Sequence, residues 1–134
     1  MEPYLMDKRF KNQGEKDLAG VLYNQGTRNA NKGNLPQAVE DFTKAIEIKP
    51  DDIMAYNNRG SAYAQQRDYI QAISDFTKAI GINPNDPVAY HNRAVAYYCL
   101  KQYDRAWGDV NMVKEIGATV NPEIIRMLKE ATGE

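Results

Sequence analysis

A period of 34 residues constrains this chain more than any other feature. Gly26, Phe42 and Pro50 recur 34 positions later as Gly60, Phe76 and Pro84. Aligning 19–52 with 53–86 gives 14 identities in 34 positions, where chance would give about two at roughly one match in twenty. A more diverged third copy spans 87–120. The 134 residues therefore divide into a leader (1–18), three repeats (19–52, 53–86 and 87–120) and a closing segment (121–134). Part of the leader, Glu15 to Leu18, could extend the first helix backwards.

Each repeat predicts two helices separated by a short break. Apolar residues recur at three- and four-residue spacing, and Asp, Asn and Pro fall where helices should begin or end. Small residues at repeated positions would let the paired helices approach closely. No strand pattern is evident. We predict helices near 19–32, 36–48, 53–66, 69–81, 87–100 and 103–116.

The closing segment predicts a helix that covers the last repeat, because stacked repeats need a polar-backed lid at their end. Asn121 can cap this helix, Pro122 suits its first turn, and Glu123 lies at the positive end of its dipole. One stripe is formed by Ile124, Met127, Leu128 and Ala131. Deleting 121–134 should expose the third repeat and favour aggregation.

Composition excludes several classes of protein. With 43% apolar and 26% charged residues, the chain falls outside the range that predicts disorder. A net charge of -1 gives no electrostatic reason to expect nucleic acid or an anionic membrane as partner. The sequence has no long apolar run and no basic, apolar start typical of a secretory signal. With neither of these features, a cytoplasmic setting is expected. The single Cys99 cannot form an internal disulfide and is compatible with a reducing compartment.

The repeat resembles the tetratricopeptide repeat. The resemblance is carried by a set of residues at fixed positions of the period: Gly26, Gly60 or Ala94 at position 8, Tyr63 or Tyr97 at 11, Ala38, Ala72 or Ala106 at 20, Phe42 or Phe76 at 24, Ala45 or Ala79 at 27, and Pro50 or Pro84 at 32. It covers 102 of the 134 residues. It implies an all-α fold: a right-handed superhelix of three antiparallel helix pairs plus a solvating C-terminal helix.

Two departures from the family pattern lead to further predictions. Positions 7 and 23 are usually apolar in the family, but here they read Arg59 with Asp75 and Arg93 with Asp109. Because both members change together, we predict an ion pair between the helices of these repeats, contributing about 0–1 kcal/mol if partly exposed. Asn29 replaces the tyrosine of position 11, so the first repeat should pack less firmly and fray first.

In the family, the first helices line a concave groove that binds peptides or partner helices. Carried onto this sequence, the groove positions supply a candidate site made of Tyr23, Asn24, Thr27, Met54, Asn57, Asn58, Ser61, Gln65, Val88, His91, Asn92, Val95 and Tyr98. Position 6 is Asn in all three repeats. Side-chain amides at this position could bond the backbone of an extended ligand, or they could bond a neighbouring helix or water.

The family's carboxylate clamp grips the acidic C-terminus of heat-shock chaperones with lysine, arginine and asparagine side chains. The matching positions here are Tyr23, Thr27, Asn58, Val88 and Asn92, and only Asn58 fits. Without cations there is no charge-assisted grip on a terminal carboxylate. We therefore predict that the chain does not bind such tails.

The residues favour a binding module over an enzyme, and no cofactor is expected. His91 and Cys99 lie eight residues apart on one predicted helix, about 12 Å along its axis, which is too far for a catalytic dyad. The paired acidic residues lie in turns between repeats, where capping explains them. The leading prediction is an adaptor for an unidentified protein or peptide. Alternatives are a chaperone-like holder of an export substrate and a homo-oligomeric scaffold that assembles through the leader or the open first repeat.

Overall fold

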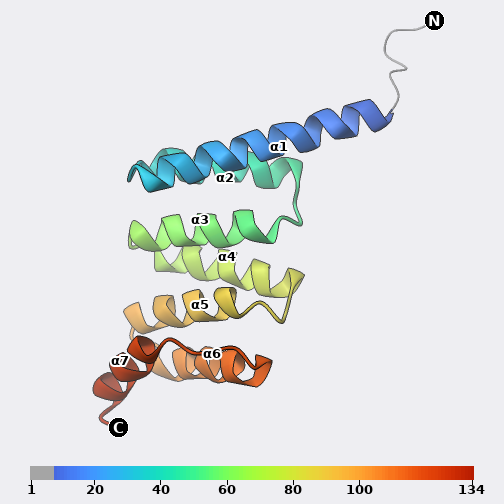
Figure 1. Ribbon diagram of the computed structural model, residues 1–134. Coiled ribbons are helices and arrows are strands. Elements are labelled where there is room, and N and C mark those ends of the chain that lie inside the picture. The colour runs from blue at the N-terminus through green and yellow to red at the C-terminus, as the bar shows by residue number, and fades with distance from the viewer. Residues whose placement is uncertain (1–7) are drawn as a thin grey trace, which may run out of the picture.

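The computed structural model describes residues 8–134, which form a stack of helix pairs closed by one further helix (Figure 1). The pairs are α1 (Lys8–Asn31) with α2 (Leu35–Ile48), α3 (Ile53–Gln65) with α4 (Tyr69–Ile82), and α5 (Pro87–Cys99) with α6 (Tyr103–Ile116), followed by α7 (Pro122–Thr132). The described residues contain no strand. The all-α fold of three helix pairs plus a C-terminal helix, which the resemblance to the tetratricopeptide repeat implied, is confirmed.

The first helices form the inner layer of the curve. α3 contacts both α1 and α5, whereas α2, α4 and α6 make no direct contacts with one another among the described residues. Instead, α2 and α4 each pack against their own partner and against the first helix of the next pair, and α6 packs against α5 and α7. The side chains of α1, α3 and α5 therefore face the concave side, where a groove was predicted.

Aspartate side chains begin several of the helices. Asp52 accepts hydrogen bonds from the backbone N–H groups of Met54 and Ala55, and Asp86 accepts one from Val88. These bonds satisfy donors that have no partner within the helix. The turn aspartates thus serve as caps, as predicted, whereas Asn34 precedes α2 without a side-chain cap bond.

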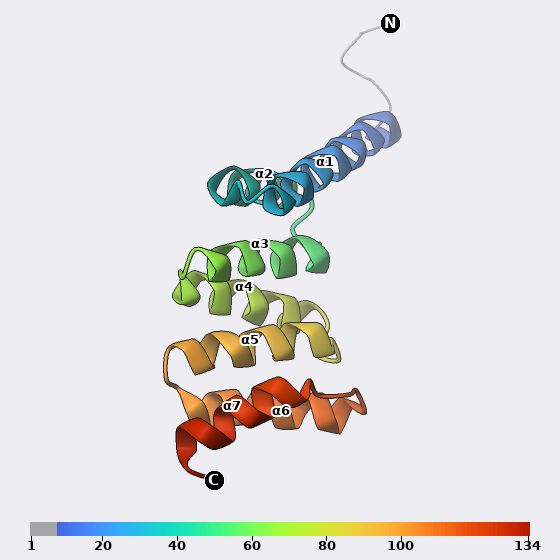
Figure 2. The same cartoon turned by 60° about the vertical axis from the view of Figure 1, so that its left-hand side comes forward.

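α1 begins much earlier than the sequence predicted. It starts at Lys8 instead of near Ala19, so residues 8–18 continue the first helix and project beyond α2 (Figures 1 and 2). Residues 11–18 are exposed all along this extension. Residues 1–7 of the leader, through which the scaffold alternative would assemble, lie outside the described residues.

Arginine pairs join the two helices of the second and third repeats, as predicted. Arg59 donates to both carboxylate oxygens of Asp75 at 2.7 and 2.8 Å, and Arg93 does the same to Asp109. Hydrogen bonding to the carboxylate raises the pKa of each arginine above its ordinary value. The side chains of Arg59 and Asp75 are only 17% and 5% exposed, so this is a largely buried pair and not the weak surface pair considered above.

Each arginine also reaches the preceding repeat. Arg59 Nη1 donates to Thr43 Oγ1 at 3.0 Å, and its guanidinium lies 5.8 and 5.9 Å from the ring centres of Tyr56 and Tyr63. Arg93 repeats this arrangement one period later. The arginines thus link neighbouring repeats as well as paired helices.

In the first repeat, the buried aspartate is hydrogen-bonded without an arginine. Its buried Asp41 accepts hydrogen bonds from Asn29 Nδ2 at 2.7 Å and from Gln37 Nε2 at 3.0 Å. Asn29, at the position where the other repeats have tyrosine, therefore has a defined partner. That the first repeat frays first stays a prediction.

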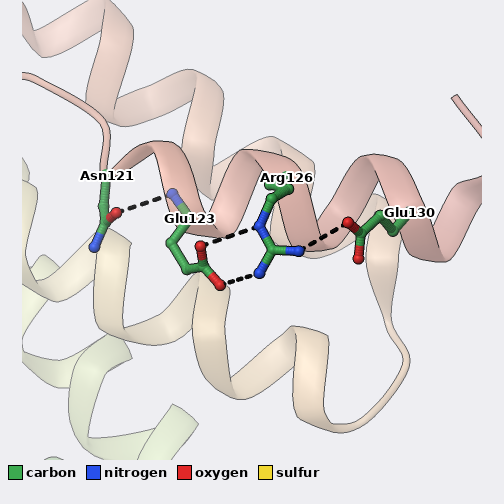
Figure 3. Close-up of polar contacts among 4 residues, drawn as sticks. All are labelled: Asn121, Glu123, Arg126 and Glu130. Carbon is green, nitrogen blue, oxygen red and sulfur yellow. Dashed lines mark hydrogen bonds and ion pairs between the residues drawn. The ribbon is translucent and has the colours of Figure 1, made fainter.

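α7 closes the C-terminal end of the stack, lying over α6 in Figure 2. Ile124 and Leu128 are buried in one cluster with Ala94, Ala106 and Val110. Ala131, which the predicted stripe included, is exposed. On the outer face Asn121 caps the helix, and Arg126 pairs with both Glu123 and Glu130 (Figure 3). Hydrogen bonding from Arg126 lowers the pKa of Glu123. An apolar inner face and a charged outer face are what a lid requires.

Close packing explains two glycines of the first helices. A Cβ atom on Gly60 would lie 2.6 Å from Phe76 Cε1, and one on Gly26 would lie 2.7 Å from Phe42 Cδ1. Both phenylalanines are buried and cannot move aside easily. The third repeat pairs a larger first-helix residue with a smaller partner, Ala94 with Val110.

We expect Gly60→Ala to lower the free energy of unfolding by about 1–3 kcal/mol, the usual cost of overpacking a core. Adding Phe76→Val should recover part of this loss, because the pair then matches the third repeat. Gly108→Ala is the control: its Cβ would meet nothing within 4 Å, so it should stabilise the helix by about 0.5–1 kcal/mol. Urea denaturation measures these three variants and Phe76→Val alone. Strictly additive costs for Gly60→Ala and Phe76→Val would contradict the clash.

Candidate peptide-binding groove

The predicted groove residues come from the inner helices α1, α3 and α5, and none of them is fully buried. Four are exposed: Asn24, Met54, Gln65 and Val88. The other nine are half-buried: Tyr23, Thr27, Asn57, Asn58, Ser61, His91, Asn92, Val95 and Tyr98. None of the thirteen residues carries a formal charge when His91 is neutral.

A hydrogen bond between two groove residues spans the first junction between repeats. Asn58 Nδ2 on α3 donates to the Tyr23 hydroxyl on α1 at 2.8 Å. The Tyr23 ring is also held against Phe42, with ring centres 5.9 Å apart. The amide nitrogen of Asn58 therefore bonds a neighbouring helix, which was one of the alternatives given for position 6. The side-chain oxygen of Asn58 stays available as an acceptor.

The other two asparagines at repeat position 6 have side-chain amides that remain available to a ligand. Asn24 and Asn92 make no side-chain hydrogen bond with the part of the chain that the structure describes. Asn92 lines a small hollow of about 180 Å³ together with Ser61, Val95 and Phe76. Of the three asparagines at position 6, one is thus bonded to a neighbouring helix and two are available to a ligand.

Several candidate residues serve the fold as well as the surface. Val95 and Tyr98 pack against the buried cluster beneath α7, and the Tyr98 ring lies 5.7 Å from that of Tyr103. Asn57 Nδ2 donates to Asp86 at 2.9 Å and so joins α3 to the cap of α5. The Thr27 hydroxyl donates to the Tyr23 carbonyl within α1.

Turn residues between repeats also border the groove, and sequence reasoning missed them. A hollow of about 720 Å³ is lined by Tyr23, Asn24 and Met54 together with residues of the turn 48–52. From the sequence, that turn could be recognised only as the end of one helix and the cap of the next. The repeat pattern does not give the distance between a turn and the inner face of the stack.

The groove offers no catalytic or metal-binding arrangement among the described residues. No group of three or more histidine, cysteine or acidic side chains could hold a metal ion there. Burial lowers the pKa of His91, which favours the neutral imidazole. Cys99 lies exposed at the end of α5. No described helix combines the length and apolar character needed to cross a membrane.

Comparison with known proteins agrees with this architecture. Family models described as tetratricopeptide or TPR repeat match residues 30–67, 53–86 and 76–108. The TPR2B domain of yeast Sti1, in its pHsp70 complex, is 30% identical with a TM-score of 0.77, over 86% of this chain and 96% of that one. This chain belongs to the tetratricopeptide repeat family. It is a protein-interaction module, as the domains of this family are.

Two further structures show the same tetratricopeptide fold. The first TPR domain of Spaghetti (RPAP3), bound to the HSP90 peptide SRMEEVD, is 26% identical with a TM-score of 0.80 and covers 88% of this chain and 93% of its own. The first TPR domain of human RPAP3 is also 26% identical, with a TM-score of 0.79, over 88% of this chain and 92% of that domain. Comparison with curated protein sequences finds no match.

Proposed function

We propose that this chain is a non-enzymatic adaptor that binds a peptide or partner helix along α1, α3 and α5, without carboxylate-clamp chemistry. The observation that carries the proposal is the Tyr23–Asn58 hydrogen bond. Tyr23 lies at the position where a carboxylate clamp has lysine. The Tyr23 hydroxyl accepts a hydrogen bond from the amide of Asn58, which is the one clamp residue present in this chain. A terminal carboxylate would meet uncharged groups that are already bonded to each other.

Magnitudes limit what the asparagines can contribute. Each net hydrogen bond to a ligand is worth roughly 0.5–1.5 kcal/mol, so three would give no more than about millimolar binding. Apolar contacts must supply the remainder. Met54 and Val88 are the exposed apolar side chains of the site, and methionine adapts readily to different partners.

Affinity capture tests this function. We expect wild-type chain, immobilised and incubated with cell extract, to retain specific proteins that are lost with Asn58→Ala plus Asn92→Ala. A matched control is Asn34→Ala plus Asn111→Ala, which removes two exposed asparagines outside the groove positions. Equal capture by the groove variant and the control would refute groove binding.

A second candidate function, a self-assembling scaffold, is favoured by the open face of the first repeat. Val21 is 50% exposed, whereas Ala55 and Ala89 at the same repeat position are completely buried. Leu18 beside it is 51% exposed. Sedimentation velocity should then show concentration-dependent mass that Val21→Glu abolishes. A constant monomer mass up to high micromolar concentration would eliminate this candidate.

A further inference from the structure

Three hollows recur along one edge of the inner layer. Two lie at the junctions between repeats, and the third lies between α5 and the segment that follows α6. The first has a volume of about 720 Å³, the second about 330 Å³ and the third about 290 Å³. Met54 lines both the first and the second, and Val88 lines both the second and the third. The three hollows therefore form one continuous row, here called the edge row, divided by two exposed apolar side chains.

The edge row repeats at the spacing of the helices. α3 contacts both α1 and α5, and helices in contact lie about 8–10 Å apart. A ligand that places equivalent side chains in successive hollows must therefore repeat at about that distance. In a β-strand, side chains on one face repeat every ~6.6 Å. In an α-helix they repeat every ~5.4 Å, or ~10.5 Å at seven-residue spacing.

A polyproline II segment matches this spacing without adjustment. It has three residues per turn and rises about 3.1 Å per residue, so residues i, i+3 and i+6 lie on one face about 9.3 Å apart. Its carbonyl groups have no internal hydrogen-bond partners. A surface that recognises it should therefore combine apolar ridges with hydrogen-bond donors.

The edge row has both features. Its ridges are Met54 and Val88, 60% and 55% exposed. In the first hollow, the Tyr23 hydroxyl accepts a bond from Asn58 and so keeps its own hydrogen to donate. The charged group of the second hollow is the Asp86 carboxylate, which disfavours acidic ligands at that point. In the first hollow, Lys16 and Lys49 accompany Glu15, Asp51 and Asp52.

We propose that the edge row binds a proline-rich segment in the polyproline II conformation, with the side chains of residues i, i+3 and i+6 in the three hollows. This names the ligand class of the adaptor function proposed above and rests on it. The segment carries apolar residues at every third position and no acidic residue opposite Asp86.

Four labelled peptides test the spacing by fluorescence anisotropy. Three share the composition of four leucines and six prolines, with leucine at every third position, at every second position, or in one block. The fourth keeps every third leucine but replaces proline by alanine, which favours a helix. We expect the first peptide to bind at least tenfold more tightly than the other three. Equal affinity for all four, or binding by none, would overturn the proposal.

Matched variants locate the binding. Met54→Ser plus Val88→Ser should weaken binding of the first peptide at least tenfold. Ile70→Ser plus Ile82→Ser removes two exposed apolar side chains outside the row and should leave binding unchanged. Loss of binding in both variants, or in neither, would also overturn the proposal. If affinity capture depends on Asn58 and Asn92 while no peptide binds, the ligand class is wrong and the adaptor function stands.

Discussion

We expect a variant with Tyr23→Lys, Thr27→Asn, Val88→Lys and Asn92→Arg to bind the acidic peptide SRMEEVD, which the wild-type chain should not bind. This is the peptide held by the first TPR domain of Spaghetti. The four changes place cations and an amide at the positions where the family's clamp has them, and Asn58 is already present. Tyr23→Lys also removes the hydroxyl that occupies the Asn58 amide.

The expected gain is large because charge-assisted hydrogen bonds are about twice as strong as neutral ones. Affinity should rise from weaker than about 1 mM to about 10 µM, a change of roughly 2.7 kcal/mol or more. Isothermal titration calorimetry measures it. Binding should weaken as salt increases, since exposed charges are screened.

Two controls make the result decisive. The same peptide with an amidated C-terminus should bind the variant poorly, and Thr27→Asn alone should not create binding. Tight binding of SRMEEVD by the wild-type chain would show that the groove does not need clamp cations. A folded variant that still fails to bind would show that the inner layer differs from the clamp domains in more than these side chains.

The 34-residue period predicted the helix bounds closely, because the capping residues and the apolar spacing within each repeat indicate the same helices that stacking of the repeats requires. Five of the six repeat helices begin and end within one residue of the predicted bounds, for example 69–81 against Tyr69–Ile82. α1 is the exception. A repeat alignment says nothing about what precedes the first copy, and between Lys8 and Ala19 no proline interrupts the helix.

Contacts within one repeat could be predicted, whereas contacts between repeats could not. The Arg59–Asp75 pair was visible because two positions depart together from the family pattern. The bonds from Arg59 to Thr43, from Asn58 to Tyr23 and from Asn57 to Asp86 join different repeats. Their geometry depends on how far each helix pair is rotated against the next, and the period does not encode that rotation.

The largest stability effect is expected at the Arg59–Asp75 pair. Arg59→Met should lower the free energy of unfolding by about 3–5 kcal/mol, because it leaves a buried carboxylate without its cation. The variant also loses the bond to Thr43 and the contacts with Tyr56 and Tyr63. Denaturation followed by far-UV circular dichroism measures the loss.

The double variant Arg59→Met plus Asp75→Leu separates the charge from the packing. Family members usually have apolar residues at these two positions, and well-packed apolar replacements of buried ion pairs are often neutral or stabilising. We therefore expect the double variant to recover most of the loss. Lys44→Met is the exposed control: its 3.2 Å pair with Glu40 leaves both side chains more than half exposed, so its removal should cost less than about 1 kcal/mol.

The outcome also bears on how the repeats are held in register. If the double variant is as stable as wild type but binds partners less selectively, the arginines fix the rotation between repeats and contribute little to stability. Arg59→Met would then act mainly through the stranded Asp75. A loss below 1 kcal/mol for Arg59→Met alone would instead mean that Asp75 finds new partners, as Asp41 does with Asn29 and Gln37 in the first repeat.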